Sequence, residues 1–425
     1  MARSREQPHP PNRPARGHRR PLAQELKAGR TLGDVLEERL APLQRGPLRP
    51  GAFSSRLHAE RVATVLGIAL GVTFTTCFLT GLISHFAQHP LEIGFLSMPA
   101  SPAGLYRVTQ GVHVASGIAS IPLLAAKLWA VYPRLFAFPP VENLVHAFER
   151  ALIPFLTGGA IFMLFTGLLN TARWYPWGFN FTVAHYWTAW IVIGALIVHI
   201  GAKLAVAGPA LRRPRRERSP EPEPDGDGIS RRGLFVAAGT AVAAVTLTTV
   251  GQTFRPLKDL ARLAPRRPDA GPQGIPVNKS AVGAQVVDAA RDADWALEVG
   301  GRVARPLRLS LAQLGELPQR EAHLPIACVE GWSAAARWRG VAIGTLLEMA
   351  SAEPGAEVVV HSLQERGSYR SSRLNVAHAR HPDTLLALQI NGETLHVDHG
   401  YPARLIAPNR PGVQQTKWVA RLEVV

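Results

Sequence analysis

Residues 61–85 read RVATVLGIALGVTFTTCFLTGLISH, a stretch in which Arg61 is the only charged side chain. A helix needs about 20 predominantly apolar residues to cross a hydrocarbon core of about 30 Å. This stretch is long enough, and comparable runs follow at 108–132, 148–170 and 182–207. The N-terminal half is therefore predicted to hold four transmembrane helices, which excludes a single soluble globule.

The net charge of +16, from 47 Lys and Arg against 31 Asp and Glu, is unevenly distributed. Residues 1–61 hold 13 basic and 6 acidic residues, and residues 203–232 hold 8 and 5, whereas the connections at 84–106 and 173–181 carry little charge. Basic residues concentrate on the cytoplasmic side of a bilayer. The pattern predicts a multi-pass protein of a bacterial plasma membrane with a cytoplasmic N-terminus. Nucleic acid is excluded as a partner, because no aromatic platforms lie among the basic residues.

These features divide the chain of 425 residues into five segments. They are a disordered basic cytoplasmic tail (1–53), a four-helix transmembrane domain (54–208), a Pro-rich charged cytoplasmic linker (209–232), a fifth transmembrane helix (233–252) and an extracytoplasmic domain (253–425). A short helix is expected within the tail near residues 31–40.

The linker ends on the sequence Ser230-Arg231-Arg232-Gly233-Leu234-Phe235. This resembles a twin-arginine export signal placed in mid-chain, although Leu234 stands where the usual motif has Phe. The resemblance implies the twin-arginine export machinery as a partner and a C-terminal domain that crosses the membrane already folded. An ordinary fifth membrane helix with a basic stop is the alternative, and it also places the C-terminal domain outside.

The C-terminal segment has a soluble composition, in which short Val- and Leu-rich runs alternate with Gly and Pro turns. Such runs are typical of strands. The predicted strands are Trp295–Val299, Val358–His361, Leu386–Ile390, Ala403–Ile406 and Leu422–Val425, and Ala342–Met349 is predicted to be a helix. The fold class expected here is α+β and mostly β.

Seven of the 15 histidines fall in the membrane segment, where ionisable side chains are costly and usually functional. His185 and His199 are 14 residues apart, which returns to within about 40° of one helix face after a rise of about 21 Å. One helix can therefore offer an imidazole near each side of the bilayer. His113, near the outer end of its run, matches the depth of His185. Two imidazoles suit an electron-transferring haem iron, because no coordination position stays open.

On the inner side, His199 needs a second histidine, either His58 or His146. His58 reaches this depth if the helix of the first run begins near Ser54. The arrangement resembles the four-helix cytochrome b subunit of bacterial formate dehydrogenases, in which the inner partner comes from the first helix. That resemblance favours His58 over His146, and it implies one or two b haems that exchange electrons with quinone or quinol.

The two cysteines differ in setting. Cys77 lies among apolar residues of the first run and is expected to be inert. Cys328 lies in the segment LPIACVEGWS (324–333) and is the only thiol of the C-terminal domain, so it cannot form a disulfide within that domain. A lone cysteine is a buried apolar residue, a nucleophile or a metal ligand. A soft thiolate suits a sulfur-rich metal centre.

The segment CVEGWS (328–333), followed by WRG (338–340), resembles the molybdenum-binding segment of the sulfite oxidase family. It is especially similar to the catalytic subunits of periplasmic methionine sulfoxide reductases. The resemblance covers about residues 275–425. The matching features later in the chain are Asp383–Ala387, Asn391-Gly392-Glu393, Asp398-His399-Gly400-Tyr401-Pro402 and the stretch from Arg404 to Lys417-Trp418. The arginines that bind sulfite in this family have no clear counterpart here, so the substrate is not carried over.

The resemblance implies a molybdopterin cofactor with the Cys328 thiolate on molybdenum. The pterin contacts that it implies are Asn278, Ser362, His399, Arg404, Gln415, Thr416 and Lys417. Arg and Lys suit the phosphate of the cofactor. Tyr369 stands where sulfite oxidases have an active-site tyrosine, and the alternative is an ordinary strand residue.

The sequence thus predicts a membrane-bound molybdenum oxidoreductase, with electrons exchanged between the quinone pool, b haems and a molybdopterin centre. Reduction of a small S-oxide or N-oxide by oxygen-atom transfer is the favoured reaction. Two alternatives stay open: a sulfite-type oxidase that passes electrons to quinone, and a haem-linked binding or sensor module without turnover.

Overall fold

The structure is a computed structural model that describes residues 46, 53, 55–90, 98–137, 141, 144–212 and 229–425. The predicted basic tail, with its short helix, and most of the charged linker lie outside the described residues.

Five described helices are long and apolar enough to cross a membrane. They are α3 (Glu60–Gln88), α4 (Leu105–Val131), α5 (Leu144–Ala172), α6 (Phe181–Arg212) and α7 (Arg231–Val250). Only 11 to 28% of the residues in their apolar windows are buried inside the protein. Most apolar side chains therefore face outward, as they do in helices that contact lipid rather than a water-soluble core. The predicted helices of the N-terminal half are confirmed as helices.

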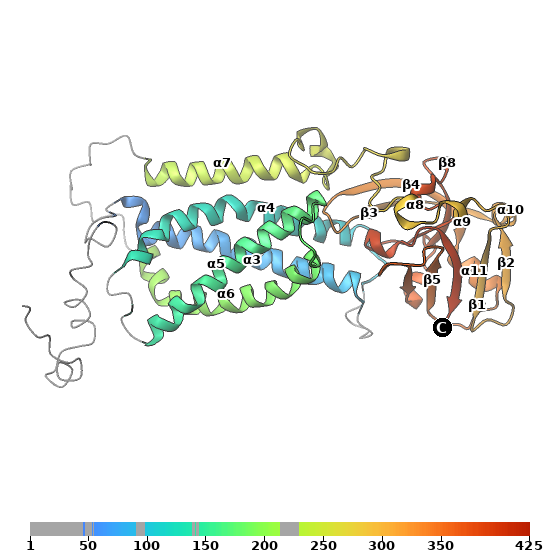
Figure 1. Ribbon diagram of the computed structural model, residues 1–425, viewed down its shortest axis with the longest axis horizontal. Coiled ribbons are helices and arrows are strands. Elements are labelled where there is room, and N and C mark those ends of the chain that lie inside the picture. The colour runs from blue at the N-terminus through green and yellow to red at the C-terminus, as the bar shows by residue number, and fades with distance from the viewer. Residues whose placement is uncertain are drawn as a thin grey trace, which may run out of the picture.

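The long helices lie side by side in a bundle, with α3 packed on α4 and α6, α5 packed on α6, and α7 packed on α4 (Figure 1). Polar side chains inside the bundle find partners across helices. The Ser120 hydroxyl donates to the Thr73 hydroxyl at 2.9 Å, and Lys127 donates to the Ala63 carbonyl. Such pairing offsets the cost of burying polar groups among apolar side chains.

The first helix does not extend back to Ser54, as the prediction for His58 required. Helix α3 begins at Glu60 because Ala59 is extended, with φ −61° and ψ 146°. His58 instead ends a separate 3-10 turn, Arg56–His58. Its Nδ1 lies 3.2 Å from the Ala130 carbonyl oxygen, so the imidazole is tied to the end of α4.

The C-terminal domain holds two five-stranded sheets. The first has the order β2 (Leu307–Ser310), β1 (Ala296–Gly301), β10 (Val419–Val424), β5 (Val358–Ser362) and β6 (Ser371–Leu374). The second has the order β3 (Gln319–Ala327), β4 (Ser333–Ala342), β7 (Leu385–Ile390) and β8 (Glu393–Thr394), with β9 (Arg404–Ile406) also paired to β7. Short helices fill the connections: α8 (Ala281–Ala284), α9 (Val287–Arg291), α10 (Leu311–Glu316), α11 (Ile343–Met349) and α12 (Val376–Ala379).

One apolar core joins the two sheets, with Leu297 and Val360 from the first and Val341, Leu386 and Leu405 from the second. The five predicted strands and the predicted helix are all confirmed within one to three residues at each end. All the pairs in these sheets are antiparallel except β1 with β10. The domain is mixed α and β with mostly strand, as expected.

The longest hairpin, β3–β4, was missed by the sequence analysis. Its strands pair without a break from Gln319 opposite Val341 to Ala327 opposite Ser333, which leaves residues 328–332 as the loop. Exposed charged residues such as Glu321 and Arg339 alternate with buried ones and break up the apolar runs. The cysteine segment is therefore a five-residue hairpin loop, whose ends are tied by the Cys328 N–H donating to the Trp332 carbonyl at 2.9 Å.

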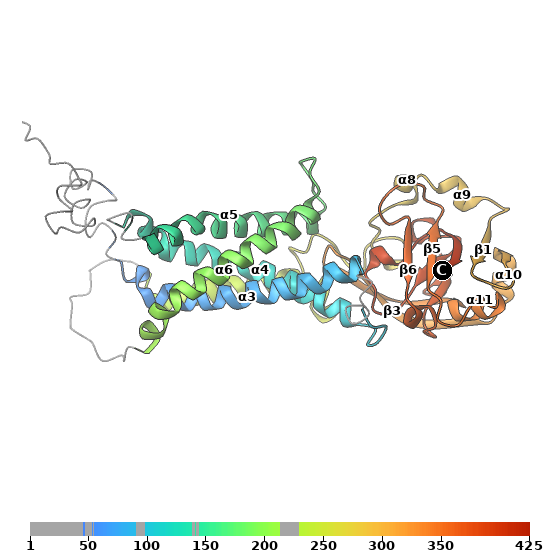
Figure 2. The same ribbon diagram turned by 90° about the horizontal axis from the view of Figure 1, so that it is seen from below.

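The sheet domain caps one end of the bundle in both views (Figures 1 and 2). Asn409 fixes this junction, because its Oδ1 accepts from the Tyr106 N–H and its Nδ2 donates to the Pro99 carbonyl, both at 2.6 Å. The Gln414 amide donates to the Gln88 carbonyl at 2.7 Å, at the C-terminal end of α3. The last carbonyls of a helix have no partner within the helix, and the sheet domain supplies one for Gln88 of α3.

Candidate functional site

A cleft in the sheet domain, with an empty volume of about 850 Å³, collects residues from distant parts of the sequence. All nine residues that the sequence analysis assigned to the molybdenum site line it: Cys328, Tyr369, Asn278, Ser362, His399, Arg404, Gln415, Thr416 and Lys417. They come from the β3–β4 loop, the segment before α8, the β5–β6 turn and the final fifth of the domain. The fold therefore brings these residues together around one space.

Cys328 is buried in the wall of this cleft, with 2% of its surface exposed. The Asn278 amide donates to its Sγ at 2.7 Å. Burial raises the pKa of the Cys328 thiol to about 12, and the nearby Glu330 carboxylate adds to the rise. A bound metal cation would reverse this balance, because a coordinating thiol is deprotonated by the charge of the metal.

Two cations line the same cleft, of which Arg404 is buried and Lys417 is half-buried. Arg404, in β9, is 5% exposed, and burial lowers its pKa to about 9. Burial, and then the charge of Arg404, lowers the pKa of Lys417 to about 7. The Lys417 ammonium donates to the carbonyl oxygens of Lys279 and Asp398, while Arg404 donates to that of His399. Both cations thus have neutral acceptors, and an anion is what would balance their charge.

Other polar atoms here also await a partner. Among the described residues, Arg404 Nε and Gln415 Oε1 are buried without a hydrogen bond. The His399 Nε2 donates to the Pro272 carbonyl at 2.7 Å, and burial lowers its pKa to about 4, so this ring is neutral. Buried polar groups in native proteins normally have partners, so the cleft has the character of a binding site for a polar, anionic group.

The structure adds detail on two of the assigned residues, Ser362 and Tyr369. The Ser362 hydroxyl donates to the Lys417 carbonyl at 2.7 Å and so holds the backbone of Lys417 in place. Tyr369 is not an ordinary strand residue, because it lies in the turn between β5 and β6. It is 37% exposed and lines the cleft, which puts its ring where an entering molecule can meet it.

The sequence analysis gave no role to Glu330, which the structure places at the centre of an ion-pair cluster. Its Oε1 lies 3.2 Å from Arg173 Nε in the α5–α6 connection, and its Oε2 lies 3.9 Å from Arg266 Nε. The Trp332 indole also donates to Oε2, at 3.2 Å. Glu330 is the only carboxylate of the hairpin loop, and this is the feature of the sequence that could have indicated an ion pair. The pairing fastens the cysteine loop to the bundle.

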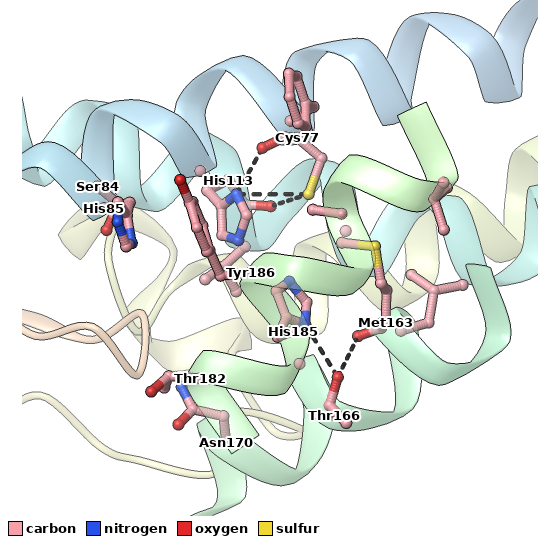
Figure 3. Close-up of a pocket in the computed structure, with 18 of the residues that line it drawn as sticks. Cys77, Ser84, His85, His113, Met163, Thr166, Asn170, Thr182, His185 and Tyr186 are labelled. Carbon is pink, nitrogen blue, oxygen red and sulfur yellow. Dashed lines mark hydrogen bonds between the residues drawn. The ribbon is translucent and has the colours of Figure 1, made fainter. Parts of the chain in front are cut away.

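A second cavity, with an empty volume of about 1450 Å³, lies inside the bundle (Figure 3). Its walls are mostly apolar, and they include His113 from α4 and His185 from α6. The centroids of these two rings are 6.3 Å apart. Figure 3 shows the two rings next to each other in the pocket, and their planes are inclined at 73°.

Each ring is oriented by a hydrogen bond through its Nδ1. The His113 Nδ1 donates to the Cys77 carbonyl at 2.8 Å, and Cys77 Sγ also lies 3.5 Å from it. The His185 Nδ1 lies 3.0 Å from the Thr166 hydroxyl, which donates its own hydrogen to the Phe162 carbonyl. The Nε2 atoms are therefore left on the sides that face each other. Metal-binding histidines are commonly held in this way, with the second nitrogen fixed by a carbonyl or hydroxyl.

The inner histidines are not assembled in the same way. His58 contacts the end of α4 and packs edge-on against Tyr132, with centroids 5.4 Å apart. His199 lies on α6, and His146 lies near the start of α5. The pairing of His199 with His58 or with His146 therefore stays a prediction.

Comparison with known proteins identifies the type of domain that forms most of the cleft. Residues 284–425 match the family described as the oxidoreductase molybdopterin binding domain. Residues 284–425 are a molybdopterin-binding oxidoreductase domain. This confirms the sulfite oxidase-like resemblance for the C-terminal part of the chain.

Two curated proteins and one solved structure are similar to parts of this chain. A protein of Azospira oryzae named as a subunit of a protein-methionine-sulfoxide reductase, YedZ1, is 35% identical over 132 residues, which are 31% of this chain and 49% of that protein. The protein-methionine-sulfoxide reductase catalytic subunit MsrP of Gluconobacter oxydans is 34% identical over 146 residues, covering 31% of this chain and 47% of that one. The chain thus spans about half the length of each of these two relatives. The sulfane dehydrogenase SoxCD of Paracoccus pantotrophus is 25% identical, with a TM-score of 0.29, over 31% of this chain and 38% of that one.

The residues of the molybdopterin-binding domain fit its cofactor. A buried thiol lines the cleft together with a buried arginine and a half-buried lysine, and in the part of the chain that the structure describes the hydrogen bonds of both cations go to backbone carbonyls. The phosphate of molybdopterin is the anion that such cations would bind. The unpartnered atoms of Arg404 and Gln415 are available to the same group.

Proposed function

We propose that this protein is a membrane-bound molybdenum oxidoreductase that reduces an S-oxide with electrons drawn from quinol through a b haem. The observation that carries the proposal is the shared cleft of Cys328, Arg404 and Lys417 in a molybdopterin-binding domain. The relatives named as methionine sulfoxide reductases support an S-oxide as substrate. The reaction balances as one sulfoxide, two electrons and two protons giving one sulfide and one water.

In this proposal Cys328 is the protein ligand of molybdenum, and Asn278 orients its sulfur. Arg404 and Lys417 bind the phosphate, while His399, Gln415 and Thr416 contact the pterin. When bound, the cofactor supplies two-electron oxygen-atom transfer. Tyr369 is at the mouth of the cleft, where its hydroxyl can donate to a sulfoxide oxygen. Ser362 acts through the backbone of Lys417 and is a positioning residue.

The bundle pocket supports a b haem held by His113 and His185. Metal–imidazole bonds are about 2 Å long, so a centroid separation of 6.3 Å leaves room for one iron between the two Nε2 atoms. The walls of the pocket around the two rings are mostly apolar, which suits a flat macrocycle. Gly81 contributes, because a Cβ there would lie 2.9 Å from His113 Cε1.

The remaining parts of the proposal concern the membrane. Quinol is the donor that the lipid phase supplies, and its oxidation gives the two electrons and two protons that the reaction consumes. The pair of His199 with His58, or with His146, is proposed to hold a second haem near the cytoplasmic side. Arg231 and Arg232, in the first turn of α7 behind the Ser230 cap, are proposed to direct twin-arginine export of the C-terminal domain. The N-terminus is then cytoplasmic and the molybdopterin-binding domain extracytoplasmic.

The test is metal analysis and reduced-minus-oxidised visible spectroscopy of the purified protein, in wild type and in Cys328→Ala. We expect molybdenum and b-type bands in the wild type, and b-type bands without stably bound molybdenum in the variant. Methionine sulfoxide should then reoxidise the reduced haem, whereas sulfite should not reduce the oxidised haem. Haem without molybdenum in a cofactor-producing host would overturn the enzyme, and sulfite-dependent haem reduction would reverse its direction.

A further inference from the structure

The hairpin loop that carries the cysteine lines both cavities. Cys328 belongs to the wall of the molybdopterin cleft, and Val329 belongs to the wall of the histidine pocket. The two cavities therefore meet at a single peptide linkage, between adjacent residues of one loop. Nothing in the spacing of the sequence indicates this, because the histidines lie more than 140 residues before the cysteine.

Gln110 completes the connection from the side of the bundle. Its Nε2 donates to the Val329 carbonyl at 2.9 Å. Gln110 is 4% exposed, lines the histidine pocket and stands on α4 three residues before His113, which is nearly one helical turn. Its side chain thus links the helix of His113 to the residue next to Cys328.

Several contacts fix this loop against the bundle, so the connection does not depend on a moving segment. The Glu330 carboxylate pairs with Arg173, and the Thr253 hydroxyl donates to the Gly331 carbonyl. Gly331 has a φ of +92°, and a Cβ at this position would lie 2.7 Å from Val114 Cγ2 on α4. A glycine is therefore required for the loop to approach the helix so closely.

We propose that electrons pass directly from the haem of His113 and His185 to the molybdenum centre through the 328–329 peptide, with the Gln110–Val329 hydrogen bond as the bridge from the bundle. This inference rests on the proposed function. Two electrons cross the bridge for each sulfoxide reduced to sulfide and water, and quinol is the reductant. Gln110 is a positioning residue that undergoes no chemical change.

The test compares Gln110→Leu with Gln414→Leu. Gln414 is a matched control, because its amide also donates to a backbone carbonyl across the same junction, at 2.7 Å, but on the Gln88 side. Each variant is reduced with dithionite and mixed with methionine sulfoxide in a stopped-flow cell, and haem absorbance is followed. The haem reoxidation rate is divided by the sulfoxide turnover driven by reduced viologen, a soluble donor that bypasses the haem. We expect this ratio to fall several-fold in Gln110→Leu and to stay at the wild-type value in Gln414→Leu.

A second readout separates electron passage from placement of the loop. Hydrogen–deuterium exchange of residues 327–333 is measured in the cofactor-free form of each variant. We expect unchanged exchange in Gln110→Leu, since the Glu330 and Thr253 contacts remain. Faster exchange there would reassign Gln110 to holding the loop and overturn the bridge. So would an unchanged ratio in Gln110→Leu, or an equal fall in both variants. A wild-type haem that methionine sulfoxide does not reoxidise would overturn the proposed electron chain as well.

Discussion

The two cavities have opposite physical characters. The molybdopterin cleft holds a buried arginine, a half-buried lysine and a buried, protonated thiol, so it suits an anionic, metal-bearing group. The bundle pocket contains two imidazoles among apolar side chains, each with one nitrogen already engaged. In the cleft, a bound anion would balance the positive charge of Arg404 and Lys417. In the bundle pocket, hydrogen bonds and packing within the helices already orient the rings of His113 and His185.

The largest expected effect is that one substitution in each cavity abolishes a different function. His185→Ala should abolish the b-type absorbance of the outer haem and quinol-driven turnover, but leave viologen-driven sulfoxide reduction. Cys328→Ala should abolish sulfoxide reduction with either donor and leave the haem bands. Spectra and both assays on the two variants check this. Loss of viologen-driven turnover in His185→Ala would mean that the cavities are not separate sites.

The junction between the cavities should be the next most sensitive feature. Glu330→Gln removes the charge from a carboxylate that is 7% exposed and paired with Arg173. We expect the free energy of unfolding to fall by about 3 kcal/mol, the lower end of the range for breaking a buried pair, because Arg173 is one-third exposed. Asp269→Asn breaks an exposed pair with Arg267 and should cost less than about 1 kcal/mol. Thermal unfolding in detergent measures both changes, and equal effects would contradict the buried role of Glu330.

Packing against His113 tests the pocket alone. Gly81→Ala places a methyl group against the imidazole, and overpacking of this kind costs about 1 to 3 kcal/mol. We expect a lower haem content and shifted haem bands, with molybdenum unchanged. Gly71→Ala, on the same helix with open space around its Cβ position, is the control and should bind haem normally. Identical spectra for the two variants would show that Gly81 does not determine the position of the His113 ring.

The pH dependence of the cofactor-free protein tests the cleft alone. Burial lowers the pKa of Lys417 to about 7, whereas an unfolded lysine titrates near 10.4. Between these values the unfolded chain binds more protons, so stability should rise with pH, by at most about 1.4 kcal/mol per pH unit. The melting temperature of the cofactor-free protein should therefore increase above pH 7. Lys417→Met should remove this increase, and a slope that persists in the variant would assign it to other groups.

Sequence patterns predicted well what depends on local composition. The long helices follow from apolar length, and β5 and β7 follow from β-branched or Leu-rich runs between turns. The β3–β4 hairpin was missed because exposed charged residues such as Arg339 interrupt its buried positions. The His58 helix was wrongly extended, because the extended backbone of Ala59 is set by contacts with α4 rather than by local propensity.

The residues of the cleft were predicted from the resemblance to the sulfite oxidase family. That resemblance did not predict the contacts between the sheet domain and the bundle. The pairs Glu330–Arg173 and Gln110–Val329 join residues that are more than 150 positions apart in the sequence. Their contact depends on how the sheet domain packs on the end of the bundle. Single polar residues in apolar helices, such as Gln110, are the only local signal of such contacts.

Helix α7 has a consequence beyond anchoring. It lies along α4 and leads the chain back to the end of the bundle at which the sheet domain lies. The bundle and the sheet domain therefore meet as parts of one polypeptide. Their encounter is intramolecular, with an effective concentration set by the tether and not by expression level. A cell that makes few copies of this protein, or dilutes it in a large area of lipid, should keep the same turnover per molecule, which a pair of separate subunits could not guarantee.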